Sequence, residues 1–89
     1  MALTERERAI LDVERSWWAA PGSVSTKGAA IRRHIGVSTT RYYQLVSALL
    51  DNPDADAYDP LVVRRLRRAR DERRRARYEG RRLAERSRR

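Results

Sequence analysis

Arginine guanidinium groups are the side chains of this sequence best suited to chemistry, and they are concentrated at one end. Residues 61–89 contain fourteen arginines and four acidic residues, a net charge of +10, whereas residues 1–60 have seven basic and eight acidic side chains, a net charge of −1. A GC-rich genome explains the preference for arginine over lysine but not the excess of cations over anions. Four carboxylates cannot neutralise fourteen guanidinium groups, so this segment is predicted to bind a polyanion. The alternative is a solvated helix held by i,i+4 pairs such as Arg67 with Asp71.

A second set of polar side chains lies on one face of a helix predicted from Ser38 to about Asp51. Tyr42, Leu45 and Leu49 recur at helical spacing and predict its buried face. Hydroxyl and amide groups on the opposite face can hydrogen-bond base edges in a major groove, and Gln44 suits a bidentate contact with adenine. The predicted base-contacting residues are Ser38, Thr39, Thr40, Tyr43, Gln44 and Ser47. Tyr43 suits the edge of a core equally well.

Basic residues near this helix and along the C-terminal segment are the predicted phosphate contacts. They are Lys27, Arg33, Arg41, Arg64, Arg65, Arg67, Arg68, Arg70, Arg73, Arg74, Arg75 and Arg77. The arginines from Arg64 to Arg70 surround the helix rather than forming one stripe, so we expect a diffuse positive field. Each phosphate that is neutralised releases counterions, which predicts binding that weakens steeply with salt.

A glycine turn precedes the polar helix and connects it to a shorter helix predicted over residues 25–35, capped by Ser25 or Thr26. Ile31 and Ile35 lie before Gly36 and Val37 follows it, a pattern that resembles the helix-turn-helix of many bacterial and phage regulators and recombinases. The resemblance implies that residues 26–50 place their second helix in a DNA groove. Arg32 departs from the pattern, because alanine is usual four residues before the glycine. The alternative is a plain helical hairpin whose polar residues are solvated.

The remaining elements complete an all-α prediction. Thr4 and Glu7 have the spacing of a capping box at the start of a helix over residues 4–20, whose Trp17 and Trp18 are predicted to be buried. Residues 1–52 are predicted as a three-helix domain, residues 53–59 as an Asp/Pro linker, and residues 60–89 as an arginine-rich helix and tail. Asp59 should cap that last helix, with Pro60 in its first turn. Helix is expected to about Tyr78, with the last ten residues disordered when free.

Several classes of function find no support in the sequence. It has no cysteine, only one histidine, no phosphate-binding glycine loop and no paired-carboxylate or Ser/His/Asp pattern, so we expect no catalysis, metal, cofactor or small-molecule substrate. No apolar run approaches the roughly 20 residues of a membrane-spanning helix, and the N-terminus lacks a signal peptide's apolar segment. The expected location is the cytoplasm, at the nucleoid.

Three stretches together resemble a known family. They are "ILDVERSWW", "IRRHIGVSTTRYYQLVSALLDNPDADAYDPLVVRRLRR" and the arginine-rich end, and they are similar to small basic proteins of actinobacteria and their phages that are catalogued as a domain of unknown function. The similarity covers most of residues 8–70. It implies a high-GC actinobacterial or phage origin, and it implies no activity.

The expected function is therefore non-catalytic binding of double-stranded DNA by a transcriptional regulator or a nucleoid-associated protein. A homodimer would extend the short sequence that one helix-turn-helix reads. RNA is an alternative partner, because arginine-rich segments also fold on RNA. The competing class is an adaptor that docks on RNA polymerase or the ribosome, which should expose an apolar patch around Trp18 or Tyr43.

Overall fold

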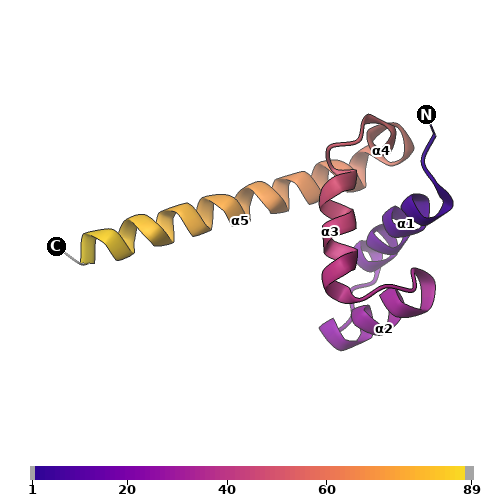
Figure 1. The fold of residues 1–89 in the computed structure, drawn as a ribbon, viewed down its shortest axis with the longest axis horizontal. Helices are drawn as coiled ribbons and strands as arrows, with labels where there is room; N and C mark the ends of the chain where they lie inside the picture. The colour runs from indigo at the N-terminus through magenta and orange to yellow at the C-terminus, as the bar shows by residue number, and fades with distance from the viewer. Residues whose placement is uncertain (1, 88–89) are drawn as a thin grey trace.

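The computed structural model describes residues 2–87, except for the side chains of residues 24 and 25, and these residues form five α-helices and no strand (Figure 1). The helices are α1 (Glu5–Ala19), α2 (Val24–His34), α3 (Thr39–Leu49), α4 (Pro53–Tyr58) and α5 (Pro60–Ser87). The all-α prediction is confirmed. No helix in this part of the chain is long and apolar enough to cross a membrane.

Helices α1, α2 and α3 begin where a side chain can accept a backbone N–H. The Thr4 hydroxyl accepts from the Glu7 amide at 3.1 Å, and the Glu7 carboxylate accepts from the Thr4 amide at 2.9 Å, so the predicted capping box is confirmed. Ser38 caps α3, as predicted. The prediction of Ser25 or Thr26 as the cap of α2 is wrong, because the Ser23 hydroxyl accepts from the Thr26 amide and starts the helix earlier.

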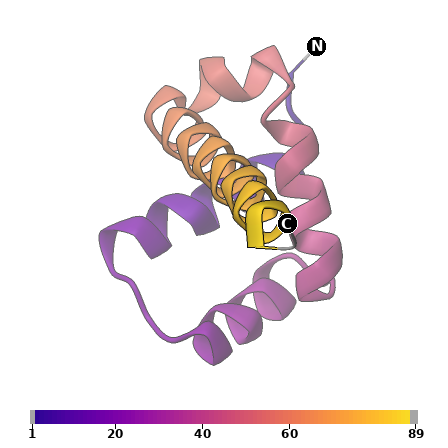
Figure 2. The same cartoon turned by 90° about the vertical axis from the view of Figure 1, so that its left-hand side faces the viewer.

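The core is shared by all five helices. Ile10, Ile31, Tyr42, Ala55 and Val63, one from each helix in chain order, are almost completely buried. The start of α5 is therefore part of the folded head rather than the start of a separate arm. Figure 2, in which α5 points toward the viewer, shows α3 on one side of it, α1 on the other and α2 below.

The segment predicted as an Asp/Pro linker, residues 53–59, is instead helix α4 and its C-cap. The Asn52 side chain accepts a hydrogen bond from the Asp54 amide at 2.9 Å, and Pro53 fits the first helical position. The acidic side chains in the first turn interact favourably with the positive end of the helix dipole. Ala55 then packs into the core. Helix α4 thus joins α3 to α5 as a packed corner.

Helix α5 is much longer than predicted. Its 28 residues span about 42 Å at 1.5 Å per residue, and Figure 1 shows most of that length projecting from the head. The expected end near Tyr78 is wrong, since helix continues to Ser87; residues 88–89 of the expected tail lie outside the described part. Arginine, alanine, leucine and glutamate are all strong helix formers, and the single exposed Gly80 costs only about 1 kcal/mol.

The prediction of a buried tryptophan pair is also wrong. Trp17 is half-buried and Trp18 is 40 % exposed. Both lie in the last turns of α1, beyond the buried residues Ile10, Leu11 and Glu14, where the core no longer covers the helix. Apolar spacing identified the correct face of α1 but not how far along the helix the core extends.

Candidate nucleic-acid interface

The turn between α2 and α3 has the backbone geometry that its glycine predicts. Gly36 has a φ of 79°, and among the described residues it is the one with positive φ. Arg32 is exposed, so its side chain does not separate the two helices. The Ser38 hydroxyl accepts from the Arg41 amide at 3.1 Å, which starts α3 directly after the turn. Helix α3 is therefore held at a tight corner with its outer face free.

That outer face of α3 carries all six predicted base-contacting residues. Each of them is exposed, while Tyr42, Val46 and Leu49 of the same helix are buried. Tyr43 is 41 % exposed, so it is not a core residue. Gln44 accepts a long 3.4 Å hydrogen bond from the Arg41 guanidinium, and both side chains are exposed. The face is polar, continuous and available to a partner.

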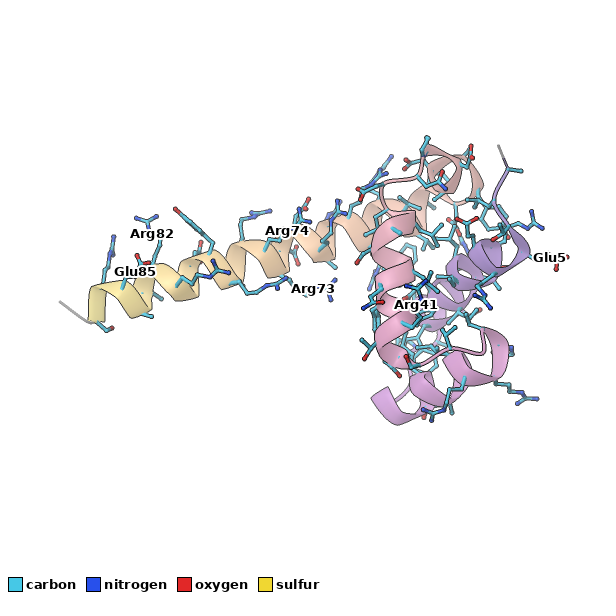
Figure 3. The ribbon with its side chains drawn as sticks, viewed as in Figure 1. Glu5, Arg41, Arg73, Arg74, Arg82 and Glu85 are labelled. Atoms are coloured by element: carbon cyan, nitrogen blue, oxygen red, sulfur yellow. The ribbon has the colours of Figure 1, made fainter. Side chains whose placement is uncertain are left out.

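A hollow of about 870 Å³ lies where α5 leaves the head beside α3; we call it the corner groove. Tyr43 and Ser47 line it from α3. The α5 side contributes Arg70, Arg73, Arg74 and Arg77. The structure thus brings two predicted base contacts together with four predicted phosphate contacts, and Figure 3 shows Arg73 and Arg74 on the part of α5 that is clear of the head.

The arginines that face this groove form a stripe without acidic residues. Counting from Arg70, positions 73, 74, 77 and 81 fall on one side of a helix with 3.6 residues per turn, and all four are arginine. Asp71, Glu72 and Glu79 lie on the other sides. We call Arg70, Arg73, Arg74, Arg77 and Arg81 the basic stripe. The expectation of a diffuse positive field concerned Arg64 to Arg70, and of these arginines Arg70 alone belongs to the basic stripe.

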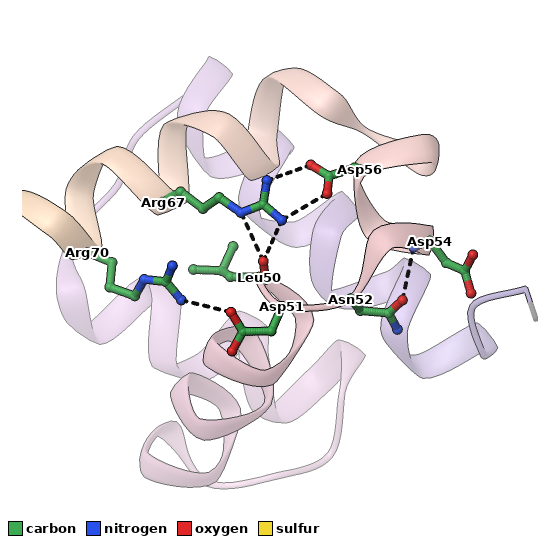
Figure 4. Close-up of polar contacts among 7 residues, drawn as sticks. All are labelled: Leu50, Asp51, Asn52, Asp54, Asp56, Arg67 and Arg70. Atoms are coloured by element: carbon green, nitrogen blue, oxygen red, sulfur yellow. Dashed lines mark hydrogen bonds and ion pairs between the residues drawn. The ribbon is translucent and has the colours of Figure 1, made fainter.

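Arg67, a predicted phosphate contact, is engaged within the protein. Its guanidinium donates to the Leu50 carbonyl at 2.9 and 2.6 Å and to both Asp56 carboxylate oxygens at 2.8 Å (Figure 4). The hydrogen bond to Asp56 raises the pKa of Arg67 further. The partners of Arg67 are thus Leu50 and Asp56, rather than Asp71 as in the alternative of a helix held by i,i+4 pairs. Arg67 joins the end of α3, α4 and α5, and so fixes the direction of α5 relative to α3.

Lys27 is also engaged within the protein. Its ammonium donates to the two Glu14 carboxylate oxygens at 3.0 and 3.2 Å, and the Lys27 and Glu14 side chains are 16 % and 7 % exposed. Burial acts to lower the pKa of Lys27, but the hydrogen bond and charge of Glu14 together raise it. Since Glu14 neutralises it, the predicted phosphate contact of Lys27 is replaced by an ion pair between α1 and α2.

The other predicted phosphate contacts lie in different environments. The Arg65 guanidinium lies 4.5 Å from the centre of the Trp18 ring, a cation–π contact. Arg70 has a 3.5 Å contact with the exposed Asp51 carboxylate and a 3.9 Å ion pair with Asp71, and its buried Nε has no hydrogen-bond acceptor. Arg70 is thus weakly held beside the groove, in contrast to Arg67. The predicted phosphate contacts Arg33, Arg41, Arg64, Arg68, Arg73, Arg74, Arg75 and Arg77 are all exposed.

One ion pair that orients α5 could not be found from sequence. Arg15 of α1 donates to both oxygens of the buried Asp59 carboxylate at 2.7 and 2.6 Å, across 44 residues of chain. Asp59 also accepts from the Val62 amide at 3.3 Å, so its predicted capping role is confirmed. The Arg15 hydrogen bond is the main cause that lowers the pKa of Asp59. Local spacing predicted the cap, but no local signal pointed to Arg15.

Within the described residues, no group of three His, Cys, Asp or Glu side chains could hold a metal ion. His34 is exposed at the end of α2.

One protein family matches most of the chain. A family described as a protein of unknown function (DUF3263) matches residues 2–78, which include the head, the corner groove and most of the basic stripe. Comparisons with curated proteins and with solved structures found no match.

Proposed function

We propose that this chain, which belongs to the DUF3263 family, binds double-stranded DNA without catalysis, as a small transcriptional regulator or nucleoid-associated protein. In this proposal α3 enters the major groove and the basic stripe follows the phosphate backbone. The observation that supports it most is the corner groove, where the polar face of α3 and the basic stripe meet.

The two surfaces have complementary roles in this proposal. Thr40 and Gln44 lie at the centre of the exposed face of α3 and present the groups that read base edges. The basic stripe runs for about 16 Å from Arg70 to Arg81 at 1.5 Å per residue, and duplex DNA carries one phosphate charge per about 1.7 Å. The stripe supplies most of the affinity and α3 supplies orientation and base preference.

The hydrogen bonds of Arg67 to Leu50 and Asp56 favour simultaneous binding of one duplex by α3 and α5. Because Arg67 and the Asp59–Arg15 pair hold the start of α5, the stripe is a rigid extension of the head rather than a flexible tail. A fixed arm loses less conformational entropy when it binds than a tethered chain does. The same packing means that deleting residues after Pro60 would remove the buried Val62 and Val63, so point variants are the appropriate test.

The alternatives fit the surface less well. An adaptor should present an apolar patch, but the exposed rings of Trp18 and Tyr43 each lie beside a cation, Arg65 at 4.5 Å and Lys27 at 5.3 Å. Double-stranded RNA has a deep and narrow major groove that side chains cannot read, so an exposed recognition helix favours B-form DNA.

The test is a salt titration of duplex binding with two triple variants of equal charge. Arg73→Ala/Arg74→Ala/Arg77→Ala removes three members of the basic stripe. Arg64→Ala/Arg68→Ala/Arg75→Ala removes three arginines of α5 that do not line the corner groove. Because the first variant leaves three phosphates without a cation, its slope of log K against log salt should fall by about 2.7. The matched control should retain most of the slope.

Sequence preference is measured in the same assay. Thr40→Ala/Gln44→Ala should reduce discrimination between duplexes more than it reduces total affinity, because neither residue contributes charge. Equal salt slopes for the two arginine variants would disprove the role of the stripe. Absence of duplex binding by the unmodified protein at low salt would disprove the proposed function altogether.

A further inference from the structure

A second hollow adjoins the corner groove and continues it along α5. This smaller hollow, of about 250 Å³, is lined by Trp18 of α1 and Arg65 of α5 among others, and it shares Glu14, Lys27 and Leu66 with the corner groove. The two hollows therefore form one trough beside α5, which runs from Trp18 past Lys27 to Tyr43 and the basic stripe. Of the outer face of α3, Tyr43 and Ser47 line the trough, whereas Thr40 and Gln44 do not.

Each half of the trough holds one exposed aromatic ring. Trp18 is 40 % exposed and Tyr43 is 41 % exposed, although their helices also contain fully buried apolar side chains, Ile10 in α1 and Tyr42 in α3. Trp18 contacts the Arg65 guanidinium, and the Tyr43 ring packs against the buried Tyr42 ring in a T-shaped arrangement at a centroid distance of 5.2 Å. Tyr42 thus supports the Tyr43 ring, and both exposed rings line the trough.

Cations line the trough, and the one acidic residue among its described lining is neutralised. Glu14 lies between the two rings, but its carboxylate is 7 % exposed and paired with Lys27. Arg65 lies at one end, and Arg70, Arg73 and Arg77 lie at the other. The centre is therefore nearly neutral and partly apolar, with Leu66 in its floor, while both ends are positive.

We infer that the trough binds an unpaired stretch of a nucleic-acid strand, with bases stacked on Trp18 and Tyr43 and phosphates on the flanking arginines. Aromatic platforms in a positively charged groove are the chemistry of single-strand binding, because every base has a stackable face whatever its sequence. A duplex cannot use these rings, since its base faces are covered by their neighbours. This site does not include Thr40 and Gln44, the proposed base-reading residues, but it shares the corner groove, with Tyr43 and the basic stripe, with the proposed duplex surface.

Tryptophan fluorescence reports the stacking, and Trp18→Phe separates the signal of Trp18 from that of Trp17, which also lines the smaller hollow. The intact protein is titrated with oligothymidylate and oligouridylate of about 15 nucleotides, within the range of known single-strand sites. The corresponding duplex is titrated in parallel. Both single strands should quench the emission, and Trp18→Phe should lose most of the quench while keeping the affinity, because phenylalanine retains a stacking face. Unchanged emission at saturating single strand would overturn the inference.

Alanine variants then measure what each ring contributes. Trp18→Ala and Tyr43→Ala should each weaken single-strand binding by about fivefold or more, the lower limit for losing one stacked base. Tyr78→Ala is the matched control, because Tyr78 is 61 % exposed, lies 5.9 Å from the Arg82 guanidinium and lines neither hollow. Thermal melting identifies any loss of folding. Folded Trp18 and Tyr43 variants that bind single strands no more weakly than the Tyr78 variant would also overturn the inference.

The outcomes separate this inference from the proposed function. Duplex binding that depends on the basic stripe, together with unquenched emission on single strands, would retain the proposed function and remove the trough site. Quenching by single strands without duplex binding would retain the trough site and remove the proposed function. Stacking by oligouridylate alone would support the inference and restrict the ligand to RNA.

Discussion

Replacing Lys27 with methionine tests whether this residue belongs to the folded core or to the phosphate-binding surface. Sequence predicts a phosphate contact, whereas the structure pairs the ammonium with both oxygens of Glu14. Methionine keeps the unbranched stem and removes the charge. The variant therefore leaves the Glu14 carboxylate in place without its cation, in a position where that side chain is only 7 % exposed.

The burial of the pair sets the expected magnitude. Removing one partner of a fully buried ion pair costs about 3–5 kcal/mol, and an exposed pair contributes about 0–1 kcal/mol. Lys27 is 16 % exposed, so the loss should lie just below the buried range, at about 2–3 kcal/mol. In a domain of this size the melting temperature should fall by about 10–20 °C. A loss of about 2–3 kcal/mol is a large part of the free energy of unfolding, which is roughly 4–13 kcal/mol for a domain of 89 residues.

Urea denaturation followed by tryptophan fluorescence measures the change, and a double variant separates the two roles. Lys27→Met/Glu14→Leu removes both charges, leaves the net charge at +9, and should recover stability to within about 1 kcal/mol, because a buried pair can be replaced by apolar residues at little cost. Glu14 raises the pKa of Lys27 above its usual 10.5, so the pair stabilises the fold below that pH. Its contribution is lost as the pH rises through the raised pKa, and the double variant should not show this loss.

Two results would refute the reasoning. A loss below about 1 kcal/mol in Lys27→Met would mean that water screens the pair as it does at a surface. A salt slope for duplex binding that falls by about 0.9 in the double variant would mean that Lys27 neutralises a phosphate after all. An unchanged slope with recovered stability would show that the role of Lys27 is structural.

Two further predictions concern the residues that hold α5. Arg67→Met should lower the melting temperature, because it removes four hydrogen bonds to Leu50 and Asp56, and should leave the salt slope of duplex binding unchanged; a slope lower by about 0.9 would indicate a phosphate contact. Arg15 lowers the pKa of Asp59 below its usual 3.8, so this pair stabilises the fold above that pH and is lost as the pH falls through the lowered value. As the pH is lowered below about 4, the urea concentration at the unfolding midpoint of the unmodified protein should therefore decrease. The midpoint of Asp59→Asn should change less over the same pH range. Identical pH profiles for the two proteins would contradict this role of the pair.

Helices α1, α2 and α3 and the charge distribution could be predicted from the sequence because their signals are local. A cap such as Thr4 or Ser38 acts on an amide three residues away, and the apolar period of α3 needs only its own turns. The turn at Gly36 is equally local, since one residue must adopt positive φ. The excess of arginine after residue 60 is a property of composition alone.

Whether each charged side chain is paired within the protein or left free depends on the tertiary structure. Arg67 and Arg70 are three residues apart on one helix, yet Arg67 has four hydrogen bonds to α4 and the end of α3 while Arg70 has one long hydrogen bond to Asp51. Lys27 is neutralised from 13 residues away and Asp59 from 44 residues away. No spacing rule covers such separations, because the partners meet only when the helices pack.

Some features of the candidate site follow from the sequence, and others depend on the tertiary structure. The sequence determined that α3 would have a polar face and that α5 would be strongly basic, since both follow from residue type and a 3.6-residue period. Only the packed head decided that these surfaces meet in one groove, that Trp18 and Tyr43 remain exposed, and that α5 is a fixed extension. The physical reason is that residue type fixes what a side chain can bind, whereas its burial and its nearest partners, which are set by packing, determine whether it is free to do so.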